Sequence, residues 1–462
     1  MKKGLFIVSL SVLLAFFLLV FCGCDMTEEG RTIRKTQINE KGELIITYTD
    51  GFTENLGVVV GRDGVDGIDG VDGVDGKDGK DGKDGIDGID GVDGKDGTDG
   101  VDGINGKDGE IIISGEGQSI SLAASLATRS AVSIVGDFGS GIYSAGSGVI
   151  YKYIPDEQAY FIITNYHVVY DADYGLADSI NVMFYGNEYS EGAFPADYVG
   201  GSSNYDIAIL RVDFFPQITP SAVPVTIADS NQVSIGDTAI AVGNARGDGI
   251  SITVGVVSVD SETIEMVPPG GKTTVKFRVM RTDAPINKGN SGGGIFNDHG
   301  ELIGIANAKI IMDGVEGFGY AIPSVLACNV ADNIIDNCYY GDNKYMQRAL
   351  LGITVAIKDS VSRYDPITGK ISIVETNYVH ELAENNLFGD KLKVNDIIKS
   401  LVLDGKEPVV ATRQFHIIDY LLQARLGDTG TLVVERRNPE TGEYEEVHLT
   451  FEITEASIVD YA

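Results

Sequence analysis

Glycine stands at every third position from Gly61 to Asp108, in sixteen consecutive triplets. Asp ends fifteen of these triplets and Asn105 ends the other, while the middle residue is Val, Ile, Lys, Arg or Thr. Such spacing is typical of a helix of three extended strands, because only glycine fits at its crowded axis. An extended, self-repelling linker is the alternative, since each strand carries fifteen Asp against six basic side chains.

The repeat, taken as residues 61–109, resembles bacterial collagen-like segments. It departs from animal collagen because it contains no proline. In either form it is a spacer, and 48 extended residues reach roughly 150 Å at about 3.1 Å each.

Residues 1–24 have the pattern of a secretory signal: two lysines, a long apolar run, and then Gly23 and Cys24. Cys24 follows a small residue and resembles the lipidated cysteine of bacterial lipoproteins, whereas bulky Phe21 precedes Cys22. The resemblance implies cleavage before Cys24 and a lipid anchor in the bacterial cell membrane. An uncleaved membrane anchor is the alternative. Either way, we expect the body of the protein to face the extracytoplasmic side.

The formal net charge of −33 argues against nucleic acid as a partner, because binding to phosphates needs a basic surface. Beyond the signal, Cys328 and Cys338 are the remaining cysteines. They lie ten residues apart in a segment of helical periodicity, which separates them by about 15 Å and predicts free thiols.

The composition divides the rest of the chain into three parts. Residues 25–60 alternate apolar and polar side chains around Asp50-Gly51, which predicts a β-hairpin. Residues 118–345 contain many short strand-like runs and a closing helix near 322–336, which favours β-barrels or a β-sandwich, and a segment of this length would make two small barrels. Residues 346–457 mix strands with one amphipathic helix, "RQFHIIDYLLQARLG". We therefore expect a mainly β fold.

The stretch "PINKGNSGGGIFND", residues 285–298, crowds glycines around Ser291. A β-turn between strands is one interpretation, and a serine nucleophile flanked by amides that bind an oxyanion is the other. The nucleophile elbow of α/β-hydrolases does not fit, because glycines and a strand follow Ser291 instead of a helix. Among the five histidines, only His167 lies at the end of an apolar strand. Asp206 directly precedes the apolar run "IAIL", where its carboxylate can face an imidazole.

Five motifs then occur in order: "GSGVI", "TNYHVV", "NYDIAIL", "TDAPINKGNSGG" and "GFGYAIP". Over about residues 125–455 the chain resembles the trypsin-like serine proteases of the HtrA/DegP (high-temperature requirement) family. The resemblance implies a trypsin-like double β-barrel in which His167 is the general base, Asp206 orients it and Ser291 attacks the carbonyl. The backbone amides of Gly289 and Ser291 are then the oxyanion hole.

The resemblance extends to specificity and to the last part of the chain. Ile286 matches the position that lines the primary specificity pocket, which implies small or medium aliphatic substrates. Two departures from the family pattern, Tyr166 and Lys288, remove no catalytic atom. The stretch "LLGIT" resembles the carboxylate-binding loop of PDZ domains, which places a peptide C-terminus at Leu351, Gly352 and Ile353. A docking domain that binds no peptide is the alternative.

The sequence thus predicts a membrane-tethered endopeptidase that acts on unfolded proteins, assembles as a homotrimer and needs no cofactor or metal. The alternative is a surface adhesin or scaffold, in which a collagen-like stalk displays the protease fold and the PDZ domain as binding modules. A complete set of His, Asp and Ser favours the enzyme, because a binding module has no use for all of them.

Overall fold

A computed structural model describes residues 33–39, 43–48, 53–58 and 120–461. Within the last range it leaves out 188–191, 246–248, 269, 272–273, 309–317 and 367. The chain divides into two compact units, 1–105 and 106–462. The signal with Cys24 and the glycine repeat lie outside the described residues. Among the residues described, no helix is long and apolar enough to cross a bilayer.

The first unit contains a small antiparallel sheet of β1 (Ile33–Ile38), β2 (Glu43–Tyr48) and β3 (Thr53–Val58). Strands β2 and β3 form the predicted pair on either side of Asp50-Gly51. Strand β1, which we did not predict, adds a third strand along β2.

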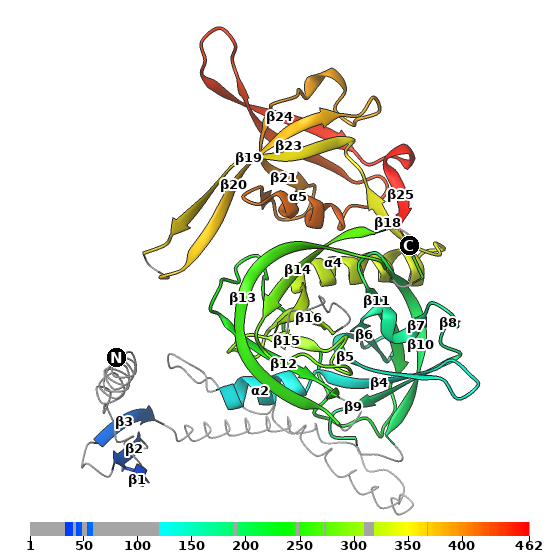
Figure 1. Ribbon diagram of the computed structural model, residues 1–462, viewed down its shortest axis with the longest axis vertical. Helices are drawn as coiled ribbons and strands as arrows, with labels where there is room; N and C mark the ends of the chain where they lie inside the picture. The colour runs from blue at the N-terminus through cyan, green and yellow to red at the C-terminus, as the bar shows by residue number, and fades with distance from the viewer. Residues whose placement is uncertain are drawn as a thin grey trace, which may run out of the picture. The chain divides into compact units, whose positions relative to one another are not determined.

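The second unit holds two closed six-stranded barrels, as expected (Figure 1). The strands of the first barrel are β4 (Ala131–Asp137), β5 (Tyr143–Ile154), β6 (Ala159–Thr164), β9 (Ser179–Phe184), β10 (Ala193–Ser202) and β11 (Ile207–Asp213). Those of the second are β12 (Thr238–Gly243), β13 (Ser251–Met266), β14 (Val275–Thr282), β15 (Gly294–Phe296), β16 (Leu302–Asn307) and β17 (Gly319–Pro323).

Strand β6 is buried along its whole length because its two faces serve different cores. Tyr160 and Ile162 point into the first barrel. Phe161 and Ile163 pack instead into a core shared with the second barrel and with helix α4 (Ser324–Ile334). Period-2 alternation therefore places every side chain of this apolar run against protein.

Short elements complete the barrel region. Helix α2 (Ile120–Thr128) precedes the first barrel, and α4 continues into a π-helical turn, Ile335–Tyr339. A helical turn, α3 (Tyr166–Val169), and the strand pair β7 (Tyr170–Asp171) and β8 (Gly175–Leu176) follow β6. Cys328 and Cys338 are free, as predicted, and burial raises their pKa values to about 12 and about 11.

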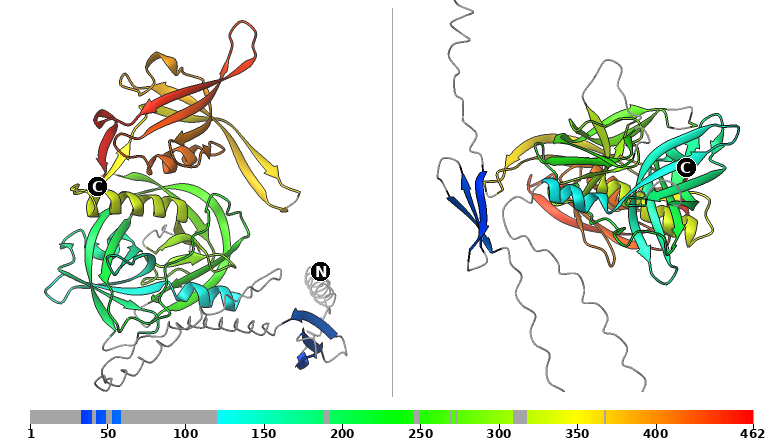
Figure 2. Two further views of the ribbon diagram at one scale, coloured as in Figure 1. Left: turned by 180° about the vertical axis from the view of Figure 1, so that it is seen from behind. Right: turned by 90° about the horizontal axis from the view of Figure 1, so that it is seen from below.

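The C-terminal part is built on a six-stranded sheet, covered by helix α5 (Gln414–Leu421) (Figures 1 and 2). Its strands are β19 (Ile353–Tyr364), β20 (Ile371–Leu382), β21 (Ile397–Leu403), β22 (Val409–Val410), β23 (Thr429–Arg437) and β24 (Tyr444–Glu452). Strands β18 (Met346–Ala349) and β25 (Ile458–Tyr461) pair beside it, and single 3₁₀ turns span Gly389–Lys391 and Glu455–Ser457. Strand β25 extends past residue 457, where we expected this part to end.

Candidate active site

His167 lies in α3, the helical turn that follows β6, and not in the strand itself. Its ring nitrogen Nδ1 is 2.7 Å from Asp206 Oδ2. Its backbone N–H donates to Asp206 Oδ1 at 3.0 Å. Two hydrogen bonds therefore fix both the backbone and the imidazole of His167 against one carboxylate.

Asp206 is fully buried in the turn directly before β11, as its place before the apolar run suggested. Its φ of 50° lies in the left-handed region, which Asp tolerates better than most residues. Asn165 Nδ2 donates to the backbone oxygen of Asp206 at 2.8 Å, and Asn307 Nδ2 donates to its Oδ2 at 2.8 Å. These amides hold the carboxylate toward His167.

Ser291 lies between β14 and β15 of the second barrel and is 5% exposed. Its Oγ accepts a hydrogen bond from the backbone N–H of Ala308 at 3.2 Å. Just before it, the N–H of Asn290 donates to the oxygen of Asn287 at 3.0 Å and closes a turn. Gly289 is the third residue of this turn and has a φ of 97°, as a type II turn requires.

Gly292 explains part of the glycine cluster. Its φ is 83°, and a Cβ at this position would lie 2.2 Å from the backbone oxygen of Ser147 and 2.3 Å from Thr164 Oγ1. No other residue fits so close to the first barrel. The glycine therefore lets the loop that carries Ser291 approach β5 and the end of β6, which His167 follows in the chain.

The predicted residues thus come from both barrels: His167 and Asp206 contact each other in the first barrel, and Ser291 lies in a loop of the second. The N–H of Ser147 donates to the backbone oxygen of Ser291 at 2.8 Å and links the two halves directly. The arrangement has the parts that acyl transfer by a serine requires: a hydroxyl, an imidazole, a carboxylate that orients it, and glycine-rich backbone at the hydroxyl. Asn165 and Asn307 were missed, because nothing in one sequence distinguishes a buried asparagine from an ordinary strand residue.

Ile286, expected to line the specificity pocket, and the two departures from the family pattern, Lys288 and Tyr166, lie close in sequence to the candidate catalytic residues. Ile286 is half-buried and packs against the core of the second barrel. Lys288 is exposed in the turn before Ser291. Tyr166 stacks on Tyr170 with the ring centroids 4.9 Å apart.

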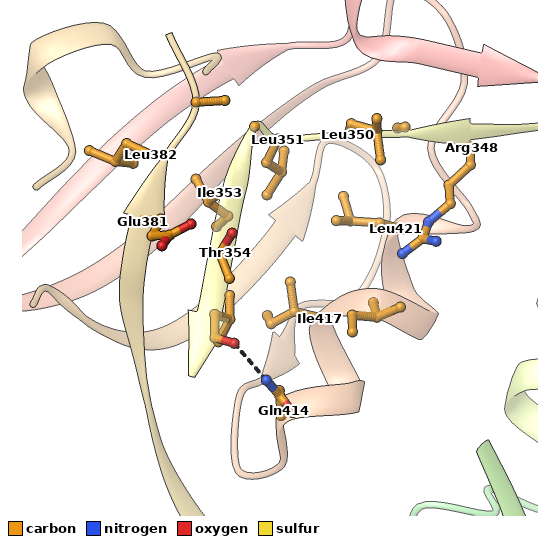
Figure 3. Close-up of a pocket in the computed structure, with 15 residues that line it drawn as sticks. Arg348, Leu350, Leu351, Ile353, Thr354, Glu381, Leu382, Gln414, Ile417 and Leu421 are labelled. Carbon is orange, nitrogen blue, oxygen red and sulfur yellow. Dashed lines mark hydrogen bonds between the residues drawn. The ribbon is translucent and has the colours of Figure 1, made fainter. Parts of the chain in front are cut away.

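Leu351, Gly352 and Ile353 line a groove of 540 Å³ between strand β19 and helix α5 (Figure 3). Gly352 has a φ of 73°, so that the chain turns sharply into the edge strand β19. The opposite wall is one face of α5, with Gln414, Ile417 and Leu421 at helical spacing. Gln414 Nε2 donates to the backbone oxygen of Val355 at 2.6 Å and closes one end of the groove.

The other side of α5 is anchored to the second barrel. The Asp419 carboxylate pairs with Arg278 of β14, and both side chains are buried. Arg413, next to the helix, pairs with Asp260 of β13 at 3.1 Å and with Glu375 of β20 at 3.2 Å. The groove wall is therefore tied to the barrel that carries Ser291.

Comparison with known proteins finds matches for the barrel region and for the glycine repeat. Residues 139–305 match the trypsin-like peptidase domain, and residues 59–116 match the collagen triple helix repeat. The chain is 32% identical over 304 residues to serine protease Do-like HtrA of Bacillus subtilis (strain 168), which covers 64% of this chain and 62% of the relative. It is 37% identical over 209 residues to periplasmic pH-dependent serine endoprotease DegQ of Escherichia coli (strain K12), covering 45% of this chain and 40% of the relative.

The chain thus spans less than two thirds of the length of these relatives. Among solved structures, the HtrA-type protease AlgW with a decapeptide matches 73% of this chain and 98% of its own, at 24% identity and a TM-score of 0.44. By sequence, the chain carries a trypsin-like peptidase domain with HtrA homologues, together with a collagen-like repeat.

Proposed function

We propose that this protein is an extracytoplasmic serine endopeptidase of the HtrA type that cleaves unfolded proteins through an acyl-enzyme. The observation that carries the proposal is the 2.7 Å contact between His167 Nδ1 and the fully buried Asp206 carboxylate, in a domain matched to trypsin-like peptidases. A buried carboxylate that is hydrogen-bonded to an imidazole in this way stabilises the imidazolium that forms when the imidazole accepts a proton.

In the proposed reaction, Ser291 Oγ attacks the carbonyl carbon of the scissile bond while its proton passes to His167 Nε2. The amides of Gly289 and Ser291 stabilise the oxyanion that forms. His167 then gives its proton to the leaving amine, and the peptide bond breaks to leave an acyl-enzyme. A water molecule, deprotonated by His167, hydrolyses the ester. The Asp206 carboxylate stabilises the imidazolium in both halves of the reaction.

Ile286 supports a preference for aliphatic side chains before the cut. It directly precedes the turn that contains Gly289, packs an apolar side chain against the second barrel, and offers no anion to a Lys or Arg substrate.

The groove beside α5 supports a second binding activity, as a PDZ domain for peptide C-termini. Strand β19 ends the sheet and can accept a peptide as an additional strand, with the terminal carboxylate at the turn of Gly352. The apolar walls favour an apolar last residue.

We further propose that Cys24 carries the lipid anchor and that the repeat 61–109 holds the protease away from the membrane as a three-stranded stalk of a homotrimer. A collagen helix needs three strands, and assembled protease domains raise the effective concentration of those strands. An ectodomain that sediments as an elongated trimer with a collagen-like circular dichroism spectrum supports this arrangement, and a monomer with a disordered stalk contradicts it.

The test of the proposed activity is cleavage of β-casein by the ectodomain that starts after Cys24, beside the Ser291→Ala variant. We expect the variant to lose about 10⁶-fold in rate, because triad members act as a unit. Mass spectrometry of the products is expected to show Val, Ala, Ile or Thr before most cuts. Equal cleavage by both proteins refutes the proposed activity, and Lys or Arg before most cuts refutes the role of Ile286.

A further inference from the structure

The motif "GSGVI" contains a serine, Ser147, to which the catalytic triad assigns no task. Ser147 lies on β5 of the first barrel and is fully buried. A buried hydroxyl is costly unless both its donor and its acceptor positions are used. The partners of this hydroxyl therefore indicate what it does.

Ser147 makes hydrogen bonds to both sides of the proposed nucleophile. Its Oγ donates to the backbone oxygen of Gly289 at 2.6 Å, and its N–H donates to the backbone oxygen of Ser291 at 2.8 Å. The same Oγ accepts the N–H of Asn244, at the end of β12, at 2.7 Å. The hydroxyl thus bridges the N–H of Asn244 and the loop that carries Ser291.

The two hydrogen bonds that Ser147 donates fix two peptide groups. The first joins Gly289 to Asn290, and the second joins Ser291 to Gly292. The peptide group that carries the amide of Ser291 lies between them in the chain. The amide of Gly289 belongs to the preceding peptide group, that between Lys288 and Gly289. This group is joined to the Gly289–Asn290 peptide group at the Cα of Gly289, where φ has the left-handed value of 97°. Both proposed oxyanion donors therefore take their direction from backbone that Ser147 holds.

Ser147 also reaches the strand that leads to the proposed base. Thr164 Oγ1, at the end of β6, donates to the backbone oxygen of Ser147 at 2.7 Å. His167 follows three residues later. One residue of β5 thus connects the oxyanion loop of the second barrel with the His167 segment of the first.

We infer that Ser147 is a positioning residue for the proposed peptidase reaction: its hydroxyl holds the Gly289 peptide so that the two oxyanion amides point at the same atom. This inference rests on the proposed function. Removal of the hydroxyl leaves the Gly289 oxygen without its donor and lets the turn relax. The substrate still binds, but the oxyanion loses well-aligned donors.

The experiment compares Ser147→Ala with the wild-type ectodomain in cleavage of a peptide substrate and in inhibition by the matching peptide boronate, which mimics the tetrahedral intermediate. We expect kcat to fall about 100-fold, as for a misplacement on the order of 1 Å, with KM unchanged. The inhibition constant of the boronate is expected to rise in proportion to the loss of kcat/KM. Ser147→Cys, which keeps a weak donor, is expected to fall between the two proteins.

Ser324→Ala is the matched control. Ser324 is fully buried, its hydroxyl donates to the backbone oxygen of Ala228 at 2.7 Å, and none of its described hydrogen bonds reaches His167, Asp206 or Ser291. We expect it to lower the Tm about as much as Ser147→Ala does while leaving kcat/KM and boronate inhibition unchanged.

Several results separate this inference from the proposed function. An active wild type with unchanged kcat/KM in Ser147→Ala overturns the inference alone, as does a loss of activity without a loss of boronate affinity. An equal loss in Ser324→Ala also overturns it, because the effect is then one of stability. If Ser147→Ala does not fold, wild-type boronate affinity in Ser147→Cys overturns it. A wild type that neither cleaves nor reacts with a fluorophosphonate overturns the proposed function, and the inference falls with it.

Discussion

Two buried aspartates, Asp206 at the candidate active site and Asp419 in α5, differ in what surrounds their charge. Asp206 is fully buried and Asp419 is 4% exposed. The carboxylate of Asp206 accepts hydrogen bonds from the backbone and ring of His167 and from Asn307, which are amide and imidazole donors. Asp419 instead faces the guanidinium of Arg278, which also lies 3.5 Å over the ring of Phe415.

This difference matches two different roles, since Asp419 anchors a helix whereas Asp206 is proposed to take part in a reaction. Burial raises the pKa of the Asp419 carboxyl, Arg278 opposes that rise, and the pair holds α5 on the second barrel. Asp206 has no such permanent partner among the hydrogen bonds described. A cation that forms on His167 during a reaction therefore has the Asp206 carboxylate as its ionic partner, and no fixed cation among the described contacts competes for that carboxylate.

The largest effect that tests this contrast is expected from Asp206→Asn. The amide has nearly the shape of the carboxylate but cannot stabilise an imidazolium, and it favours the wrong tautomer of His167. We expect kcat to fall about 10⁴-fold, with the Tm within a few degrees of wild type. Casein cleavage and thermal unfolding followed by circular dichroism provide the two measurements. A loss of less than tenfold contradicts the role of Asp206.

The two aspartates also show what one sequence can reveal. Asp206 was predictable because it directly precedes the apolar run of β11 and because the motifs with His167 and Ser291 occur in a fixed order. Nothing local marks Asp419, since its partner Arg278 lies 141 residues earlier. The pairing exists only once the domains are in contact.

The same limit applied to the fold. The continuous apolar runs of β6 and β11 are visible in the sequence. Strand β10 has no such run, because Pro195, Gly200 and Gly201 interrupt its pattern, although it pairs with β9 and β11 on its two sides. His167 was placed at a strand end but lies in the four-residue helical turn α3. A segment this short shows no helical periodicity in the sequence.

The second prediction concerns the anchoring pair. Asp419→Ala leaves the Arg278 charge buried without its partner, which typically costs about 3–5 kcal/mol in the free energy of unfolding. The double variant Arg278→Met with Asp419→Leu removes both charges and is expected to lie near the wild type. Urea unfolding of the ectodomain, followed by circular dichroism, measures both. Equal destabilisation in the single and double variants shows that the pair is not the anchor.

The third prediction concerns the groove on the opposite face of α5. Gln414 Nε2 donates a hydrogen bond to the backbone oxygen of Val355. This oxygen is an acceptor on the edge strand that an incoming peptide strand can use. Gln414→Ala frees this acceptor, so we expect peptides with an apolar C-terminal residue to bind about fivefold more tightly, as for one hydrogen bond. Titration calorimetry measures the affinity, and the same peptide with an amidated C-terminus is the control. Weaker binding to the variant means that Gln414 contacts the peptide instead.

The smallest expected effect is a pH dependence at His416, beside the anchoring pair. His416 is 9% exposed, and its Nδ1 lies 3.0 Å from the backbone oxygen of Val410. Burial lowers its pKa, with Arg278 and Arg413 acting in the same direction and the Val410 oxygen and Asp229 against it. The unfolded chain therefore binds the proton more tightly. The stabilisation that neutral His416 contributes is present above its unfolded pKa of about 6.5 and is lost as the pH falls through the lower folded value. We expect the urea midpoint of the wild-type protein to decrease from pH 7 to pH 5 by more than the urea midpoint of His416→Asn does.

The control is His448→Asn, because His448 is exposed and pairs only with exposed Glu446 among its described contacts. If His416→Asn and His448→Asn change the pH dependence equally, then His416 does not link protonation to the contact between α5 and the barrel.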